Sequence, residues 1–460
     1  MQRTSPHRES VRPSTLLSHT ARSRPVPLTV AALGVTALLL SGCAQGSGAA
    51  SSSSGSPAEE TTPSAKEVSH LAPRAVVSYD GGLLTMDTES GEVVEDTKED
   101  GFLRLNNAGD GRHVMVSDGD RFRLFDTGLE ARAHGDHFHY HESAPALTDR
   151  AFEAPHAGHV VAHAGATTLF SDGDGSIQTV EWPALRGADG GAVERKKAQA
   201  PHHGVALRLA DGSLLTTQGT EAERHTVQVL APDGSVRAET TDCPGVHGET
   251  VAADEAVVLG CESGPVVYRD GAFHKVPVET EYQRSGNLAG TKASSIVLGD
   301  HKVDADAEQE RPTEIALIDS VQDALTTVDL GSSYWFRSLG RGPEGESLVL
   351  TYDGELNILD ESGKILHEVK AIEPWEEKAE WQQPGPILKS ADGLAYITDA
   401  EQQKLVVVDI AQGTVERTLD LPVAPVEMVV VTGHAESSTE HADHSDHEGH
   451  EDEGHEGHDH

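Results

Sequence analysis

The chain has 460 residues and carries 76 acidic against 35 basic side chains, a formal net charge of −41. This charge makes nucleic acids and anionic membrane surfaces poor partners and makes cations good ones. Aromatic residues make up only 4% of the chain, whereas 46 glycines are present, a composition that suits many tight turns between strands.

The first 42 residues predict a lipoprotein signal peptide. Five arginines between residues 3 and 24 precede an apolar run, residues 26–40, that is too short to span a membrane comfortably. The run ends in Leu40-Ser41-Gly42-Cys43, which resembles the bacterial lipobox, whose cysteine is lipidated; an ordinary signal peptide is the alternative. We therefore expect an exported protein on the extracytoplasmic face, held to the cell membrane only by lipid on Cys43. Residues 43–71 are expected to form a flexible tether.

Residues 72–433 alternate short apolar runs with Asp-Gly or other Gly-rich turns. Asp-Gly between two such runs predicts a β-hairpin, because Gly accepts a positive φ at no steric cost. Histidines that precede such runs recur 44 to 46 residues apart, at His113, His159, His203 and His247. Comparable strand starts follow near residues 294, 337 and 386.

A period near 45 residues is typical of the four-stranded blades of a propeller. We therefore expect an all-β fold, a seven-bladed β-propeller, with eight blades as the nearest alternative. Residues 427–431 are expected to close the ring by pairing with the N-terminal blade.

Metal-ligand side chains are densest at residues 134–142, with four histidines and two carboxylates in nine residues. In an extended segment, His137, His139 and His141 would share one face because side chains alternate. With His134 and Asp136 they offer ligands that suit zinc, and nickel or copper equally well. A His-rich polar surface loop is the alternative.

Equivalent positions of different blades meet around the central channel of a propeller. We therefore expect His113, His159, His203 and His247 to lie at one level, with the 134–142 loop folded over them to complete a single zinc site. The alternative for each histidine taken alone is a hydrogen-bonded turn residue.

Residues 434–460 predict a disordered metal-binding tail. They contain eight histidines and ten acidic residues but no Lys, Arg, Val, Ile, Leu or aromatic residue, so they cannot bury a core. An inert solubilising tail is the alternative. The expected metal-capturing residues are His441, His444, His447, His450, His455, His458 and His460.

With Cys43 assigned to lipid, Cys243 and Cys261 remain. In an oxidising compartment an even pair favours a disulfide, and the absence of a C-x-x-C pattern makes a cysteine metal site the weaker alternative.

Several motifs together resemble the AztD-type zinc metallochaperones over roughly residues 72–434. They are the loop at residues 134–141, Pro201-His-His-Gly204, Cys243-Pro-Gly-Val-His-Gly-Glu249 and Gly260-Cys-Glu-Ser-Gly264. The resemblance implies an extracytoplasmic zinc-binding propeller that hands zinc to the solute-binding protein of a zinc ABC importer. It also implies ligands among His137, His139 and the blade-start histidines, and a disulfide between Cys243 and Cys261.

The lipobox and the C-terminal position of the His-rich tract depart from that family and leave the delivery geometry open. We expect a monomeric, non-enzymatic protein without catalytic residues that captures zinc and delivers it. The alternatives are a metal-dependent propeller hydrolase, with Glu142 or Glu249 as general base, and a metal-buffering surface lipoprotein without a transfer partner.

Overall fold

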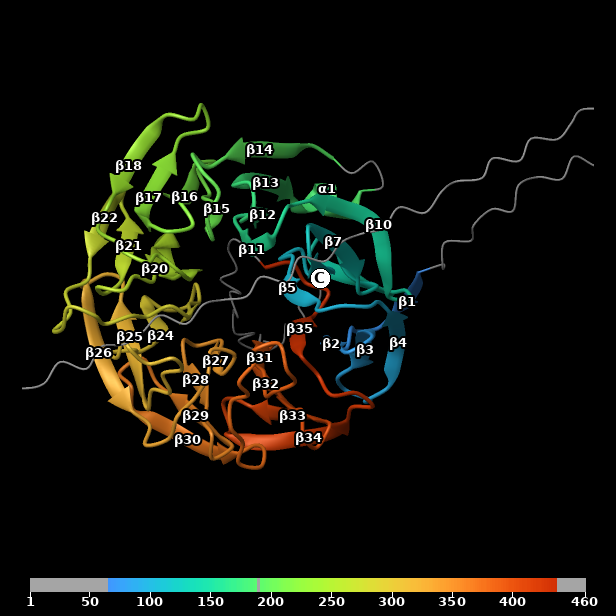
Figure 1. The fold of residues 1–460 in the computed structure, drawn as a ribbon. Helices are drawn as coiled ribbons and strands as arrows, with labels where there is room; N and C mark the ends of the chain where they lie inside the picture. Colours follow the sequence, from blue (N-terminus) through green and yellow to red (C-terminus); the bar gives the residue numbers. More distant parts are fainter. Residues whose placement is uncertain (1–64, 188–190, 437–460) are drawn as a thin grey trace, which may run out of the picture. The chain divides into compact units, whose positions relative to one another are not determined.

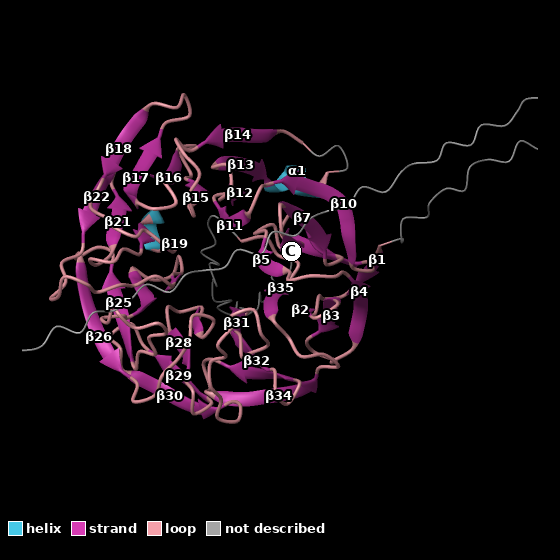
Figure 2. Cartoon of the chain, in the orientation of Figure 1, coloured by secondary structure: helices cyan, strands magenta, loops and turns pink. Residues whose placement is uncertain are grey.

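The computed structural model describes residues 65–187 and 191–436. The signal segment, Cys43 and the histidines from His441 to His460 lie outside these ranges. The described residues are almost entirely strand and loop (Figure 2), with one α-helix, α1 (Trp182–Arg186), and one 3-10 turn, η1 (Ala253–Glu255). Within the described part of the chain, no helix is long and apolar enough to cross a membrane.

Eight sheets of four antiparallel strands make up the body of the fold. The first four, each from its inner to its outer strand, are β35 (Glu427–Val431), β2 (Arg74–Tyr79), β3 (Gly82–Asp87), β4 (Val93–Lys98); β5 (Arg104–Asn107), β6 (His113–Asp118), β7 (Arg121–Asp126), β10 (Ala146–Glu153); β11 (Ala157–His163), β12 (Ala166–Ser171), β13 (Ser176–Glu181), β14 (Val193–Lys197); and β15 (Ala206–Arg208), β16 (Leu214–Gly219), β17 (Arg224–Leu230), β18 (Val236–Thr240). The other four are β19 (Glu249–Val251), β20 (Val257–Leu259), β21 (Val266–Arg269), β22 (Ala272–Lys275); β23 (Leu288–Ala289), β24 (Ile296–Asp300), β25 (Glu314–Asp319), β26 (Ala324–Asp329); β27 (Leu339–Arg341), β28 (Ser347–Leu350), β29 (Glu355–Leu359), β30 (Ile365–Lys370); and β31 (Leu388–Ala391), β32 (Leu394–Asp399), β33 (Lys404–Asp409), β34 (Thr414–Asp420).

The sheets form a closed ring in sequence order (Figure 1). Each sheet contacts the next, mostly through the inner strands, and β31 of the last sheet contacts β35 of the first. This is the arrangement expected of a β-propeller. The count of eight four-stranded sheets differs from the seven blades predicted and agrees with the alternative. The series of strand starts reached only seven because the inner strand of the remaining sheet, β35, comes from the opposite end of the chain.

Strand β35 closes the ring as the sequence predicted. It pairs antiparallel with β2, and Val429 lies opposite Val76. Both strands are buried along most of their length, so closure leaves no inner edge of this sheet exposed.

Burial changes with position in each sheet. Second and third strands such as β3 and β33 are buried on both faces, whereas outer strands such as β4 and β34 are largely exposed. The core therefore lies between neighbouring sheets; for example, Tyr396 and Leu405 share a cluster with Val77 and Met86. Strands packed on both faces produce the continuous apolar runs seen in the sequence.

The Asp-Gly pairs sit in hairpin turns, as predicted. Gly119 connects β6 to β7 with φ +58°, and Gly354 connects β28 to β29 with φ +81°. A side chain at these left-handed positions would strain the turn.

A ninth, three-stranded sheet carries the His-rich loop. It contains β8 (Leu129–His134), β9 (His137–Glu142) and β1 (Lys66–Val68), with β9 in the middle. Strand β1 falls inside the segment predicted to be a flexible tether, and it is ordered by pairing with β9.

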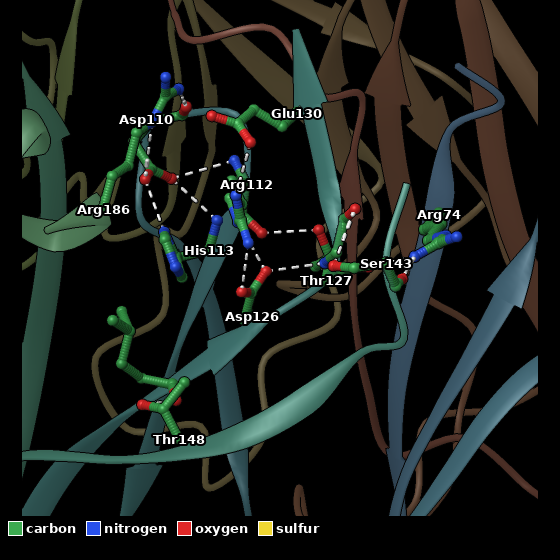
Figure 3. Close-up of polar contacts among 12 residues, drawn as sticks. Arg74, Asp110, Arg112, His113, Asp126, Thr127, Glu130, Ser143, Thr148 and Arg186 are labelled. Carbon is green, nitrogen blue, oxygen red and sulfur yellow. Dashed lines mark hydrogen bonds and ion pairs between the residues drawn. The ribbon is translucent and has the colours of Figure 1, made fainter. Parts of the chain in front are cut away.

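Ion pairs fix the base of this sheet (Figure 3). Arg112 binds Asp126 at 2.7 Å and Glu130 of β8 at 3.0 Å. On the other side, the backbone N–H of Ala131 donates to the carbonyl of Gly433. The position of the hairpin is therefore set by both the ring and the segment that follows β35.

Candidate metal centre

The histidines gather into two separate groups of three. His159, His203 and His247 form one group, which we call the triad; His134, His137 and His139 form the other, the hairpin group. Within each group, one ligand atom per residue lies within 4.8 Å of the others. The sequence analysis had expected a single site that combined these residues, and the structure divides them.

The triad lies where three neighbouring sheets begin. His159 is on the inner strand β11, and His203 and His247 lie just before the inner strands β15 and β19. All three are half-buried. The blade period thus brings together three side chains that are widely separated in sequence, as predicted.

Each triad ring is held by a hydrogen-bond acceptor at Nδ1. The acceptor is Asp172 for His203 at 2.5 Å, Glu249 for His159 at 3.2 Å, and the carbonyl oxygen of Gly286 for His247 at 2.8 Å. Carboxylates and carbonyls only accept, so Nδ1 of each neutral ring carries the proton.

With Nδ1 protonated, Nε2 of each neutral ring presents a lone pair. Nε2 of His159 and Nε2 of His203 are 3.4 Å apart, so these lone pairs repel unless a cation lies between them. Two nitrogens at zinc-ligand distance from one ion, in tetrahedral geometry, are about 3.3 Å apart. A carboxylate or carbonyl behind each ligating imidazole is also the usual outer shell of a zinc site.

Burial, followed by the neighbouring His159, lowers the pKa of His247 to about 3. The hydrogen bond to Gly286 acts in the opposite direction but does not restore the usual value. His247 therefore stays neutral, the form that binds metal, throughout the physiological pH range.

The hairpin group repeats this arrangement in the open. His134 and His137 are cross-strand partners, and Nε2 of His137 lies 3.3 Å from Nε2 of His139. Behind them, Glu67 of β1 binds Nδ1 of His139 at 2.8 Å and Asp136 binds Nδ1 of His137 at 3.3 Å. His137 and His139 are about half exposed, with side-chain exposures of 54% and 44%.

Two predicted ligands lie outside both groups. His113 is buried, and its Nδ1 binds Asp110 at 2.6 Å in the polar network beside α1 (Figure 3). His141 lies on β9 with His137 and His139, as the alternation predicted, yet it is not one of the three grouped histidines. Asp136 acts behind His137, as a hydrogen-bond acceptor.

Sequence reasoning missed the residues that orient the rings. Asp172 belongs to an Asp-Gly-Asp-Gly segment that reads as an ordinary turn, and Glu67 lies in the predicted tether. The Gly286 contact is made by the backbone, so no side-chain pattern marks it. For Glu249 the signal was present, because it ends the motif that contains His247.

Cys243 and Cys261 form a disulfide, as expected. It closes the loop that carries His247 and leads into Glu249. Both sulfurs are buried among Leu215, Val246 and other residues of one core cluster, so this part of the triad rests on a cross-linked support.

No family model matches the chain. In sequence, it is 25% identical over 327 residues to the zinc chaperone AztD of Citrobacter koseri, covering 68% of this chain and 75% of that protein. Two solved structures of Citrobacter koseri AztD superpose with TM-scores of 0.67 (the apo form) and 0.68, at 20% and 21% identity. They cover 80% and 78% of this chain, and 100% and 98% of their own.

A more distant likeness is to the dihydro-heme d1 dehydrogenase NirN in complex with DHE. Its TM-score is 0.51 at 13% identity, over 81% of this chain and 78% of that one. At such identities a structural likeness establishes the fold alone. In both sequence and fold, the chain resembles the AztD zinc chaperones.

Proposed function

We propose that this protein is an extracytoplasmic zinc chaperone that holds zinc on the triad and gives it up by ligand exchange. The observation that carries the proposal is the convergence of three Nε2 lone pairs, each ring being fixed from behind by Asp172, Glu249 or the Gly286 carbonyl. Three histidines leave a fourth position of a tetrahedral ion open. A receptor can enter that position before the chaperone ligands leave.

The hairpin group and the tail are proposed to collect metal rather than to retain it. The hairpin rings are exposed and their supporting carboxylates are on the surface, so binding there must order more freely moving side chains. The tail offers the seven histidines from His441 to His460 together with many carboxylates. The triad is expected to be the tighter site because its ligands are preorganised.

The proposed receptor is the solute-binding protein of a zinc ABC importer, the partner that the resemblance implies. Further parts of the proposal are an eight-bladed propeller over residues 72–433, a monomeric state, and attachment to the cell membrane by lipid on Cys43. A surface lipoprotein that only buffers metal would lack the transfer step. Nickel and copper fit the same ligands.

A hydrolase is the weaker candidate. The carboxylate nearest the triad, Glu249, accepts a hydrogen bond from His159 and so supports a ligand instead of facing the open position as a general base would. We propose no catalytic residue.

Zinc titration of the mature protein tests the binding. We expect His159→Ala with His203→Ala to remove the tightest zinc, and His137→Ala with His139→Ala to remove a weaker one. His225→Ala is the matched control, because His225 is exposed and bonds only to the adjacent Thr226. Unchanged tight binding in the triad variant would refute the assignment.

Transfer is tested by mixing the zinc-loaded protein with the apo solute-binding protein and measuring the metal on each after separation. We expect transfer faster than release to a chelator in the absence of the receptor. Transfer no faster than that release would leave a buffering protein.

A further inference from the structure

The channel beside the triad contains an excess of positive charge, in a chain whose net charge is −41. Arg104, Arg337 and Lys389 line a cavity of about 270 Å³ together with His159 and His247. The cavity has one carboxylate, Glu427, opposite its arginines and lysine, besides the Glu249 that is bonded to His159.

These cations are incompletely neutralised. Glu427 pairs with Arg337, but Nε of Arg337 has no partner among the described residues. Lys389 makes no hydrogen bond or ion pair with any residue in the described ranges, and it remains open to water although the inner strands surround it. Burial lowers the pKa of Lys389, which indicates that the protein alone does not supply enough negative charge at this point.

A second cavity of about 640 Å³ continues the first along the channel. The two share Asn106, Val160 and Glu249 in their linings. On β11 the first cavity reaches His159 and the second reaches His163. These positions are four residues apart in one strand, or about 13 Å.

The C-terminal segment enters the channel at the end away from the triad. After β35, His434 packs against Phe138 and Tyr140 of the hairpin, with ring centroids 5.1 and 5.9 Å apart. The N–H of Glu436 then donates to the carbonyl of Gly109, and Glu436 lines the larger cavity. The 24 residues that follow contain nine Asp or Glu and no Lys or Arg.

We propose that residues 437–460 dock inside the channel, with their carboxylates against Arg104, Arg337 and Lys389. About four extended residues span the distance, so the tail is long enough several times over. A short tether gives its carboxylates an effective concentration in the millimolar range, which favours them over free anions.

Docking brings the tail histidines beside His159 and His247. Metal gathered by the tail can then reach the triad within one molecule, by exchange of one imidazole for another. This consequence rests on the proposed zinc function, whereas the docking itself requires no metal.

Zero-length carbodiimide cross-linking of the full mature protein, stripped of metal on a chelating resin, tests the docking. The reagent activates a carboxylate, and a lysine amine within contact distance displaces it to form an amide. We expect mass spectrometry to find Lys389 joined to tail carboxylates of the same molecule. Lys98 with Asp96 and Lys378 with Glu401 are internal controls for the reaction, at 2.7 and 2.8 Å.

Charge reversal supplies a second arm. Arg104→Glu should reduce the yield of Lys389–tail products several-fold, while the Lys98–Asp96 product is unchanged. Salt at 1 M should do the same, because it shortens the screening length to about 3 Å.

The proposal is overturned if the controls react and Lys389 does not join the tail, or if tail carboxylates join exterior lysines as often as Lys389. Products between two molecules would also overturn it. Protection of Lys389 by free citrate with no tail product would assign the cavity to a free carboxylate instead. None of these outcomes affects the zinc titration, so the docking and the zinc function can fail independently.

Discussion

His203 donates from Nδ1 to Asp172 at 2.5 Å, and the same ring approaches Nε2 of His159 to 3.4 Å. The carboxylate therefore sets both the tautomer and the direction of a metal-binding nitrogen. Loss of such an outer partner typically costs about 10- to 100-fold in metal affinity.

Asp172→Asn should weaken zinc binding at the triad by about that factor, measured by competition with a chelator of known affinity. Asp174→Asn is the matched control, because Asp174 lies in the same turn but caps Ser176 and faces Lys197. Equal losses in both variants would mean that the turn, and not the Asp172 bond, supports the site.

Glu67→Gln should weaken metal binding at the hairpin group and leave the triad unchanged. The substitution removes the charged acceptor of His139, but the group is exposed, so we expect a loss near the lower end of the roughly 10- to 100-fold range. Cobalt titration with visible spectra of the two sites would measure it. A loss confined to the triad would contradict the division into two groups.

Removal of the disulfide should affect stability and one site together. Cys243→Ala with Cys261→Ala frees a loop of this size at a cost of about 3 kcal/mol in the free energy of unfolding. That loop carries His247, so zinc affinity should fall at the triad. The hairpin group in the same molecule is the internal control, and equal losses at both sites would contradict the prediction. Denaturant unfolding and zinc competition are the measurements.

The network beneath the hairpin predicts a pH dependence. Burial raises the pKa of Asp126, but the hydrogen bond and charge of Arg112 outweigh it, so the pKa lies below 3.8. A carboxyl with a pKa lower in the folded than in the unfolded protein stabilises the fold above pH 3.8, and this contribution is lost as the pH falls through the folded-state pKa.

Asp126→Asn should therefore lower the free energy of unfolding near pH 7, by about 1–3 kcal/mol, and reduce its decline between about pH 4 and pH 2. Urea unfolding at several pH values would show both effects. Asp420→Asn, which breaks an exposed pair with Lys404, should change little. An unaltered acid limb in Asp126→Asn would contradict the assignment.

Periodicity in the sequence was enough to predict the all-β class, the closing strand and three of the four blade-start histidines. It failed for His113 because a repeat gives the spacing of sheets and not the position within a sheet. His159 lies on an inner strand, whereas His113 begins β6, the second strand of its sheet, where it is buried against Asp110.

The single composite site could not be corrected from sequence. The hairpin pairs with β1, which comes from a segment whose composition suits a tether, and this pairing builds a separate sheet. The groups that orient the triad rings are a turn aspartate, a glutamate and a backbone carbonyl, and their roles depend on contacts between different blades. The excess of cations in the channel is likewise contributed by separate strands, β5, β27 with the loop before it, and β31.

The pairing of β35 with β2 also determines when the molecule can become a ring. Val76 cannot meet Val429 until more than 350 intervening residues have been synthesised, and contacts of such long sequence separation form slowly. Seven sheets can assemble from consecutive hairpins while the chain is still emerging, but the eighth must wait for the last strand. Circularisation is thus a late step, and a chain truncated before residue 427 would retain an unpaired sheet edge that is prone to aggregation.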